Sequence, residues 1–265
     1  MLFDVHGRQA HAYTTGPAAH TASPPPIVFI HGAQNDHSVW SGQADRLAAL
    51  GHGVLAIDLP GHGASSPPGG GPALASVDAM ADWLLALLDA AGLPSALLAG
   101  HSMGSLIALE AAARAPQRVA GLALIGTAFP MRVSGKLLAA ARDDEPAAID
   151  MVAKWSHAAP SLVDASRRLM QDLSHRNPDR LLYTDFAACD AYANGLAAAS
   201  AVRCPVLFIR GTHDLMTPAR ASEALTAAIE HGSIVDVDAG HAMMAEQPDA
   251  VFEALAAFAA GCAQR

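Results

Sequence analysis

A serine lies between two glycines in the stretch GHSMG, residues 100–104. The stretch follows the apolar run ALLAG and opens the helical run SMGSLIALEAAA, which is the strand, turn and helix context of a G-x-S-x-G nucleophile. Such a tight turn strains its central residue and crowds the flanking positions, so glycine is required at 100 and 104. The pattern predicts that Ser102 is an exposed nucleophile, with a helix-capping serine as the structural alternative.

An aspartate and a histidine follow two later apolar runs. Asp214 lies in PVLFIRGTHDLMTP and His241 in IVDVDAGHAMMAEQP. A histidine with a pKa near 6.5 can take a proton from a serine and return it to a leaving group, and an aspartate can orient that histidine. Of the 13 histidines in the chain, His241 alone follows a strand after both the serine and the acid. The order Ser102, Asp214, His241 therefore predicts a catalytic triad, although a turn aspartate is the alternative for Asp214.

A third segment, HGAQNDHSVW, follows the apolar run IVFI at residues 27–30. Acyl transfer needs two backbone N–H groups aimed at the developing oxyanion, one after the nucleophile and one from the loop after an earlier strand. Met103 and Ala33 are the predicted donors. Gly32 would let the backbone approach the substrate closely, and His31 belongs to the same loop. An ordinary turn at the end of a strand is the structural alternative.

These residues are positioned by strands and helices that alternate along the chain. The amino terminus reads as a hairpin closed near Gly7. Continuous apolar runs between helical segments are typical of parallel strands buried on both faces, and predict an α/β fold with a mostly parallel sheet. The runs span residues 25–30, 53–58, 96–100, 121–126, 205–210 and 233–238.

One interval, residues 129–203, interrupts this alternation. It contains Ala-rich helical segments and no convincing strand. Because the strands on both sides read as members of one sheet, we expect a helical cap inserted into a core made of residues 1–128 and 204–265. A separate domain is the alternative.

Composition narrows the class of protein. The chain has 265 residues, 52% of them hydrophobic and 15% charged, a mean hydropathy of +0.25 and a net charge of −9 with only two lysines. These values predict a globular protein that binds neither nucleic acid nor membrane. The first residues do not read as a signal peptide, so we expect a cytoplasmic protein. Three scattered cysteines indicate no disulfide framework and no metal site.

Taken together, five segments resemble the α/β-hydrolase superfamily, in the group with a helical cap. They are, in order, HGAQNDHSVW, AIDLPGHGASS, GHSMG, RGTHDLMTP and AGHAMMAEQP. The order of nucleophile, acid and base also agrees with that family. The resemblance implies an eight-stranded, mostly parallel sheet whose second strand is antiparallel, flanked by helices, with the cap inserted after the sixth strand. It also implies a structural loop at AIDLPGHGASS, in which Asp58 and His62 are not catalytic.

The predicted reaction is hydrolysis of a small ester, lactone or thioester through an acyl-enzyme, without metal or organic cofactor. A C–C bond hydrolase, a lyase or a perhydrolase using the same triad remains open, as does a non-catalytic binding protein. The expected partner is a small molecule, and the expected state is a monomer or a homodimer. His31 and Gly32, with Met131, Trp155 and Met170 from the cap, are candidate pocket residues, although cap methionines at helical spacing often only pack.

Overall fold

The computed structural model of the chain describes residues 1–18, 24–177 and 179–263. In this part of the chain, eight strands form one sheet in the order β1-β2-β4-β3-β5-β6-β7-β8. The strands are β1 (Leu2–Val5), β2 (Arg8–Thr15), β3 (Ile27–Ile30), β4 (Val54–Ile57), β5 (Ala96–His101), β6 (Val119–Ile125), β7 (Val206–Gly211) and β8 (Gly232–Val237). Each predicted apolar run therefore contributes one strand.

The first two strands differ in direction from the others. β1 and β2 form the expected hairpin, and its turn places His6 and Gly7 at positive φ. β2 then pairs with β4 in antiparallel register, with Ala12 opposite Ile57. The other six strands, β3 to β8, are parallel to one another. The predicted eight-stranded sheet with an antiparallel second strand is confirmed.

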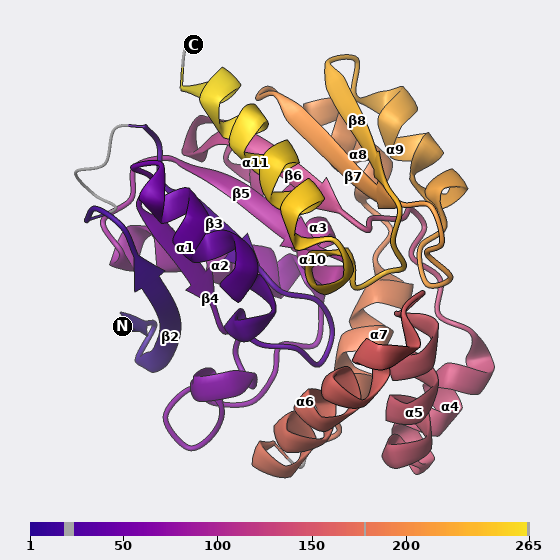
Figure 1. Cartoon of the computed structure of the whole chain (residues 1–265). Helices are drawn as coiled ribbons and strands as arrows, with labels where there is room; N and C mark the ends of the chain where they lie inside the picture. The colour runs from indigo at the N-terminus through magenta and orange to yellow at the C-terminus, as the bar shows by residue number, and fades with distance from the viewer. Residues whose placement is uncertain (19–23, 178, 264–265) are drawn as a thin grey trace.

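Helices cover both faces of the sheet (Figure 1). They are α1 (Ser41–Ala49), α2 (Val77–Ala90), α3 (Met103–Arg114), α4 (Gly135–Asp143), α5 (Glu145–Trp155), α6 (Val163–Arg176), α7 (Leu181–Ala191), α8 (Gly195–Ala201), α9 (Glu223–Ala228), α10 (Met243–Glu246) and α11 (Pro248–Cys262). In the described residues, no helix is both long enough and apolar enough to cross a membrane.

Strand β3 shows why the central runs are apolar at every position. Val28 and Ile30 pack in the core cluster that includes α2 and α3, whereas Ile27 and Phe29 pack in the cluster that includes α1 and α11. Side chains of a strand alternate between the two faces, so a strand with helices on both sides needs apolar residues throughout. This burial holds the carboxyl ends of the parallel strands in a fixed row.

Helices α4, α5, α6 and α7, called the cap helices below, lie together at one end of the sheet (Figure 1). They occur between β6 and β7 in the chain and share a separate apolar cluster that includes Leu137, Ile149 and Phe186. Helix α8 follows them but packs with α3 in the main core, through Ala198 and Ala199. The predicted boundaries of the insertion, at 129 and 203, stay a prediction.

The turn from β5 into α3 is closely packed against its neighbours. A Cβ atom added at Gly104 would lie 2.3 Å from the carbonyl oxygen of Ile30, and one at Gly100 would lie 2.1 Å from the carbonyl oxygen of Gly104. Both contacts involve backbone atoms, which cannot move aside as the end of a flexible side chain can. Absence of a side chain at these positions is thus a condition for the turn at Ser102.

We predict that Gly104→Ala lowers the free energy of unfolding by roughly 1–3 kcal/mol or more, because the added methyl group overpacks a rigid contact. Gly261→Ala is the matched control, since a Cβ atom there meets nothing within 4 Å. This second substitution, in helix α11, should stabilise the protein by up to about 1 kcal/mol. Urea unfolding of both variants measures the effect, and equal midpoints for Gly104→Ala and the wild type would contradict it.

Candidate active site

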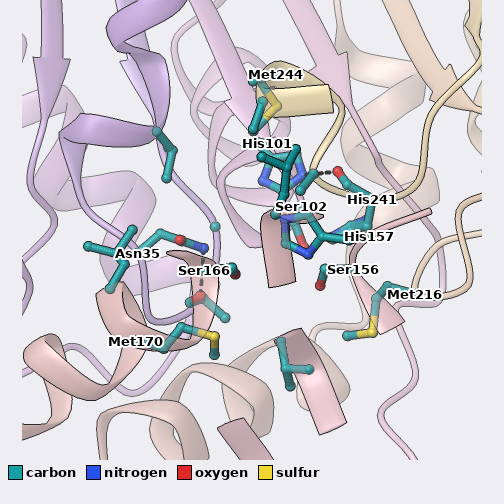
Figure 2. A pocket seen from close by; sticks show the side chains of 18 of the residues that line it. Asn35, His101, Ser102, Ser156, His157, Ser166, Met170, Met216, His241 and Met244 are labelled. Atoms are coloured by element: carbon teal, nitrogen blue, oxygen red, sulfur yellow. Dashed lines mark hydrogen bonds between the residues drawn. The ribbon is translucent and has the colours of Figure 1, made fainter. Parts of the chain in front are cut away.

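Ser102 occupies a strained turn between a buried strand and a buried helix. It follows β5, precedes α3, and has φ +53° and ψ −120°, a conformation that non-glycine residues rarely adopt. Its N–H donates to the carbonyl oxygen of Ile125 at 2.9 Å, which ties the turn to the end of β6. The side chain lines a cavity of about 240 Å³ (Figure 2).

His241 and Asp214 meet beside that cavity. His241 follows β8, Asp214 follows β7, and His241 Nδ1 lies 2.8 Å from Asp214 Oδ2. The side chains of both residues are buried, and His241 lines the same cavity as Ser102 (Figure 2). Because a carboxylate only accepts, Nδ1 carries the proton of this bond, and Nε2 of the neutral ring is left as a base. The structure thus brings the three predicted triad residues to one site.

The Asp214 carboxylate is held by several donors at once. Its Oδ1 accepts the backbone N–H groups of Met216 at 2.8 Å and Thr217 at 2.7 Å, and its Oδ2 lies 2.7 Å from Thr217 Oγ1. Burial alone would raise the pKa of Asp214, but the His241 ring and these hydrogen bonds lower it below the usual range. Asp214 is therefore a fixed negative charge beside His241.

Thr217 is a site residue that the sequence analysis missed. Besides Asp214, its hydroxyl lies 2.9 Å from the carbonyl oxygen of Gly126 and 3.0 Å from His241 Nδ1. The hydroxyl has one proton, which Asp214 Oδ2 and the carbonyl oxygen of Gly126 share or compete for, and its lone pairs can accept from His241 Nδ1–H. The sequence feature that could have identified Thr217 is its position three residues after Asp214, where a hydroxyl can close a local turn.

Two other histidines near the triad have separate partners. His101 Nε2 lies 2.9 Å from the carbonyl oxygen of His241, and burial lowers the pKa of His101 to about 3, so its ring is neutral. His213, next to Asp214 in the chain, is exposed, and its Nε2 lies 2.9 Å from Asp238 Oδ1. Neither ring takes the place of His241 against Asp214.

The two predicted oxyanion donors belong to two different segments near Ser102. Met103 is the first residue of α3, so its N–H belongs to the helix end that has no intrahelical acceptor. Ala33 lines the cavity with Ser102. A Cβ atom added at Gly32 would lie 3.1 Å from Ser102 Cβ, which shows how closely this loop passes the serine. The roles of Ala33 and Met103 in binding an oxyanion stay a prediction.

The structure differs from the sequence-based expectation at His31, which is fully buried and lines neither cavity at Ser102. Its Nε2 accepts the N–H of Leu59 at 3.1 Å, so its Nδ1 carries the proton and donates to the carbonyl oxygen of Gly32 at 2.8 Å. Burial and the neighbouring His62 lower the pKa of His31 to about 4. His31 therefore holds, as a neutral ring, the peptide unit whose N–H belongs to Ala33.

The other candidate pocket residues divide between two cavities. Gly32 and Met170 line the first cavity, whereas Met131 and Trp155 line a second one of about 190 Å³. Both cavities reach the predicted nucleophile. The residues that they share are Ala33, Ser102, Phe186 and Met216.

Within the described residues, one group has the composition and spacing of a metal site: His11, His37 and Asp58. Each imidazole Nδ1 lies 2.8 Å from a different oxygen of Asp58, and those oxygens also accept backbone N–H groups from His37 and Ala64. One nitrogen of each ring, Nδ1, is thus used in a hydrogen bond to the carboxylate. These hydrogen bonds account for the cluster as a network that joins β2 and the segment of His37 to Asp58 in the predicted structural loop.

Comparison with known families agrees with the fold. A model of the alpha/beta hydrolase fold family matches residues 25–248, and this chain therefore belongs to the α/β-hydrolase family. The solved structure of the enol-lactonase from Burkholderia xenovorans LB400 superposes with a TM-score of 0.84 at 26% identity, covering 97% of this chain and 99% of that one.

Two curated relatives match over different lengths. A pimeloyl-[acyl-carrier protein] methyl ester esterase of Chromobacterium violaceum is 34% identical over 76% of this chain and 80% of its own length. The acetyltransferase component of the acetoin cleaving system of Cupriavidus necator, which acts on a dihydrolipoyllysine residue, is 39% identical, but over only 46% of this chain and 30% of its own length. The second likeness thus concerns less than a third of that relative.

We predict that Thr217→Val lowers kcat by roughly 10- to 100-fold with little change in KM, because a hydrogen bond to a charged group is worth about 1.5–3 kcal/mol and the lost hydroxyl orients Asp214 and His241. Thr217→Ser keeps the hydroxyl and should recover most of the rate. Steady-state kinetics with a chromogenic ester measures both variants. A kcat for Thr217→Val equal to that of the wild type would show that the hydroxyl has no part in orienting the pair.

Proposed function

We propose that this protein is a serine hydrolase that cleaves a small ester-like substrate, an ester, lactone or thioester, through an acyl-enzyme. The observation that carries the proposal is the meeting of Ser102 with the hydrogen-bonded pair His241 and Asp214 at one cavity. Membership of the α/β-hydrolase family supports it, and so do the names of the relatives, which include a methyl ester esterase and an enol-lactonase.

The proposed mechanism begins with His241 Nε2 taking the proton of Ser102 Oγ while Oγ attacks the carbonyl carbon. The N–H groups of Ala33 and Met103 bind the resulting oxyanion, and His241 returns the proton to the leaving oxygen or sulfur. A water molecule then repeats these steps on the acyl-enzyme and releases the acid. Asp214 stabilises the imidazolium in both halves of the reaction.

The two cavities support an assignment of the two sides of the substrate. His241 lines the first cavity and not the second, and a general acid must lie within hydrogen-bond reach of the leaving group. We therefore place the leaving group in the first cavity and the acyl group in the second, with the reacting carbonyl beside Ser102 and Ala33. Both volumes lie below the roughly 300–1,000 Å³ of sites for drug-sized ligands, which favours a small-molecule partner.

We predict that Ser102→Ala loses about 10⁴-fold or more of the rate of p-nitrophenyl ester hydrolysis and all labelling by a fluorophosphonate probe. Ser166→Ala, which removes another serine from the lining of the first cavity, should keep both properties. Undiminished hydrolysis by purified Ser102→Ala would reject the mechanism. Labelling without turnover on a panel of esters, lactones and thioesters would instead point to the C–C bond, lyase or perhydrolase chemistry.

We also predict that filling the first cavity changes the specificity for the alcohol group of the substrate, and that filling the second changes the specificity for its acyl group. Ala165→Phe in the first cavity should weaken kcat/KM for bulky alcohol groups by tenfold or more, because a lost methylene-sized space is worth about 1–3 kcal/mol. Val133→Phe in the second cavity should lower kcat/KM for long acyl groups by a similar factor. Two ester series, one varied in the alcohol and one in the acid, separate the effects, and the reverse pattern would invert the assignment.

A further inference from the structure

The peptide unit that follows Ala33 is held at both of its polar ends. Its carbonyl oxygen, that of Ala33, accepts Asn35 Nδ2 at 3.0 Å, and its N–H, that of Gln34, donates to Asp185 Oδ2 at 2.8 Å. Gln34 has φ +45°, a left-handed conformation that costs energy in any residue with a side chain. The loop beside the predicted oxyanion donor thus adopts a strained shape that these hydrogen bonds maintain.

Asp185 reaches this loop from a cap helix, 151 residues later in the chain. It lies on α7, its exposed fraction is 0%, and its Oδ2 also lies 2.9 Å from His62 Nε2. Its Oδ1 has no hydrogen-bond partner among the described residues. Burying a carboxylate with one oxygen unsatisfied is costly, so apolar packing alone does not explain an aspartate at this position.

His62 is charged when it pairs with this carboxylate. Its Nδ1 lies 3.1 Å from the carbonyl oxygen of Pro60, which only accepts, and its Nε2 faces Asp185, so both nitrogens act as donors. Burial alone would lower the pKa of His62, but the neighbouring Asp185 raises it above the ordinary value. The hydrogen bond from Gln34 N–H to the carboxylate that pairs with His62 is therefore charge-assisted, and such bonds are shorter and stronger than neutral ones.

We propose that Asp185 is a positioning residue for the oxyanion hole. By fixing the Ala33–Gln34 peptide unit from the cap side, it sets the backbone angle after Ala33 and thereby the direction of the Ala33 N–H. His31 fixes the preceding peptide unit through the carbonyl oxygen of Gly32, so the donor is held on both sides. Donors that are fixed before the reaction stabilise an oxyanion without reorganisation, and the inference rests on the proposed acyl transfer at Ser102.

Other contacts attach the cap to the core without touching this backbone. Asn177 Nδ2 donates to the carbonyl oxygen of Gly61 at 2.9 Å, in a buried contact between the end of α6 and the structural loop. Loss of this bond should loosen the cap as loss of Asp185 would, but it leaves the Gln34 N–H bond in place. Asn177→Ala is therefore the matched control that separates attachment of the cap from positioning of the donor.

The experiment compares Asp185→Ala, Asp185→Asn and Asn177→Ala in the full chain with a p-nitrophenyl ester. Asp185→Ala should lower kcat by roughly 10- to 100-fold with a smaller change in KM, because a small misplacement of a donor costs up to about 10²-fold. Asp185→Asn keeps an oxygen acceptor and should remain within roughly fivefold of the wild type. Asn177→Ala should keep the wild-type kcat even if its melting temperature falls.

A second readout reports the oxyanion directly. A trifluoromethyl ketone adds to Ser102 as a tetrahedral oxyanion, so its affinity for Asp185→Ala should fall by the same factor as kcat/KM. If circular dichroism shows Asp185→Ala unfolded, the double variant His62→Leu, Asp185→Leu carries the same test, because apolar residues often replace a buried ion pair without loss of stability.

The outcomes separate this inference from the proposed function. Activity retained by Ser102→Ala rejects the acyl-transfer mechanism, and the role of Asp185 with it. Activity that depends on Ser102, together with a folded Asp185→Ala or leucine double variant that keeps the wild-type kcat and ketone affinity, rejects the role of Asp185 alone. An equal loss of kcat in Asn177→Ala also rejects it, because attachment of the cap would then explain the effect.

Discussion

The contact between the turn at Ser102 and the end of strand β3 sets how closely two segments of the site approach each other. A Cβ atom at Gly104 would lie 2.3 Å from the carbonyl oxygen of Ile30, so α3 begins directly against the backbone of β3. The loop that leaves β3 must then pass the serine, where a Cβ atom at Gly32 would lie 3.1 Å from Ser102 Cβ. This approach sets the positions of both predicted oxyanion donors, because Met103 begins α3 and Ala33 belongs to that loop.

The cap helices contact the site on a second side, at the loop of His241. The N–H of Ala242 donates to the carbonyl oxygen of Ser156 at 2.8 Å, and Glu246 accepts the N–H groups of Gly240 and Ala158, both at 2.7 Å. Together with the bond from Gln34 to Asp185, these contacts tie the cap to the segments that carry His241 and Ala33, one of the two predicted oxyanion donors. The position of the cap is therefore coupled to the geometry of the reaction centre as well as to the shape of the cavities.

Features of the site that depend on local sequence could be predicted, whereas features that depend on contacts between distant segments could not. Ser102, Asp214 and His241 could be predicted because each follows an apolar strand, and the sheet brings strand ends together. His31 was expected in the pocket from its place beside Gly32, but its ring direction depends on the N–H of Leu59, 28 residues away. Asp185 lies in an Ala-rich helical segment, where its sequence neighbours give no sign of a partner in another part of the chain.

The buried pair of His62 and Asp185 joins the cap to the core at a high cost in desolvation free energy. Apolar residues of similar volume would join the two surfaces at equal or lower cost, since desolvation of a buried ion pair often exceeds its attraction. Apolar residues cannot, however, accept the N–H of Gln34, and that N–H is buried in a backbone held at φ +45°. Leaving it without an acceptor would cost about 1–3 kcal/mol on top of the strain, and the loop would relax toward another shape. The conformation of the loop beside Ser102 thus requires an oxygen acceptor from the cap, which Asp185 supplies, and His62 pairs with the carboxylate that Asp185 brings.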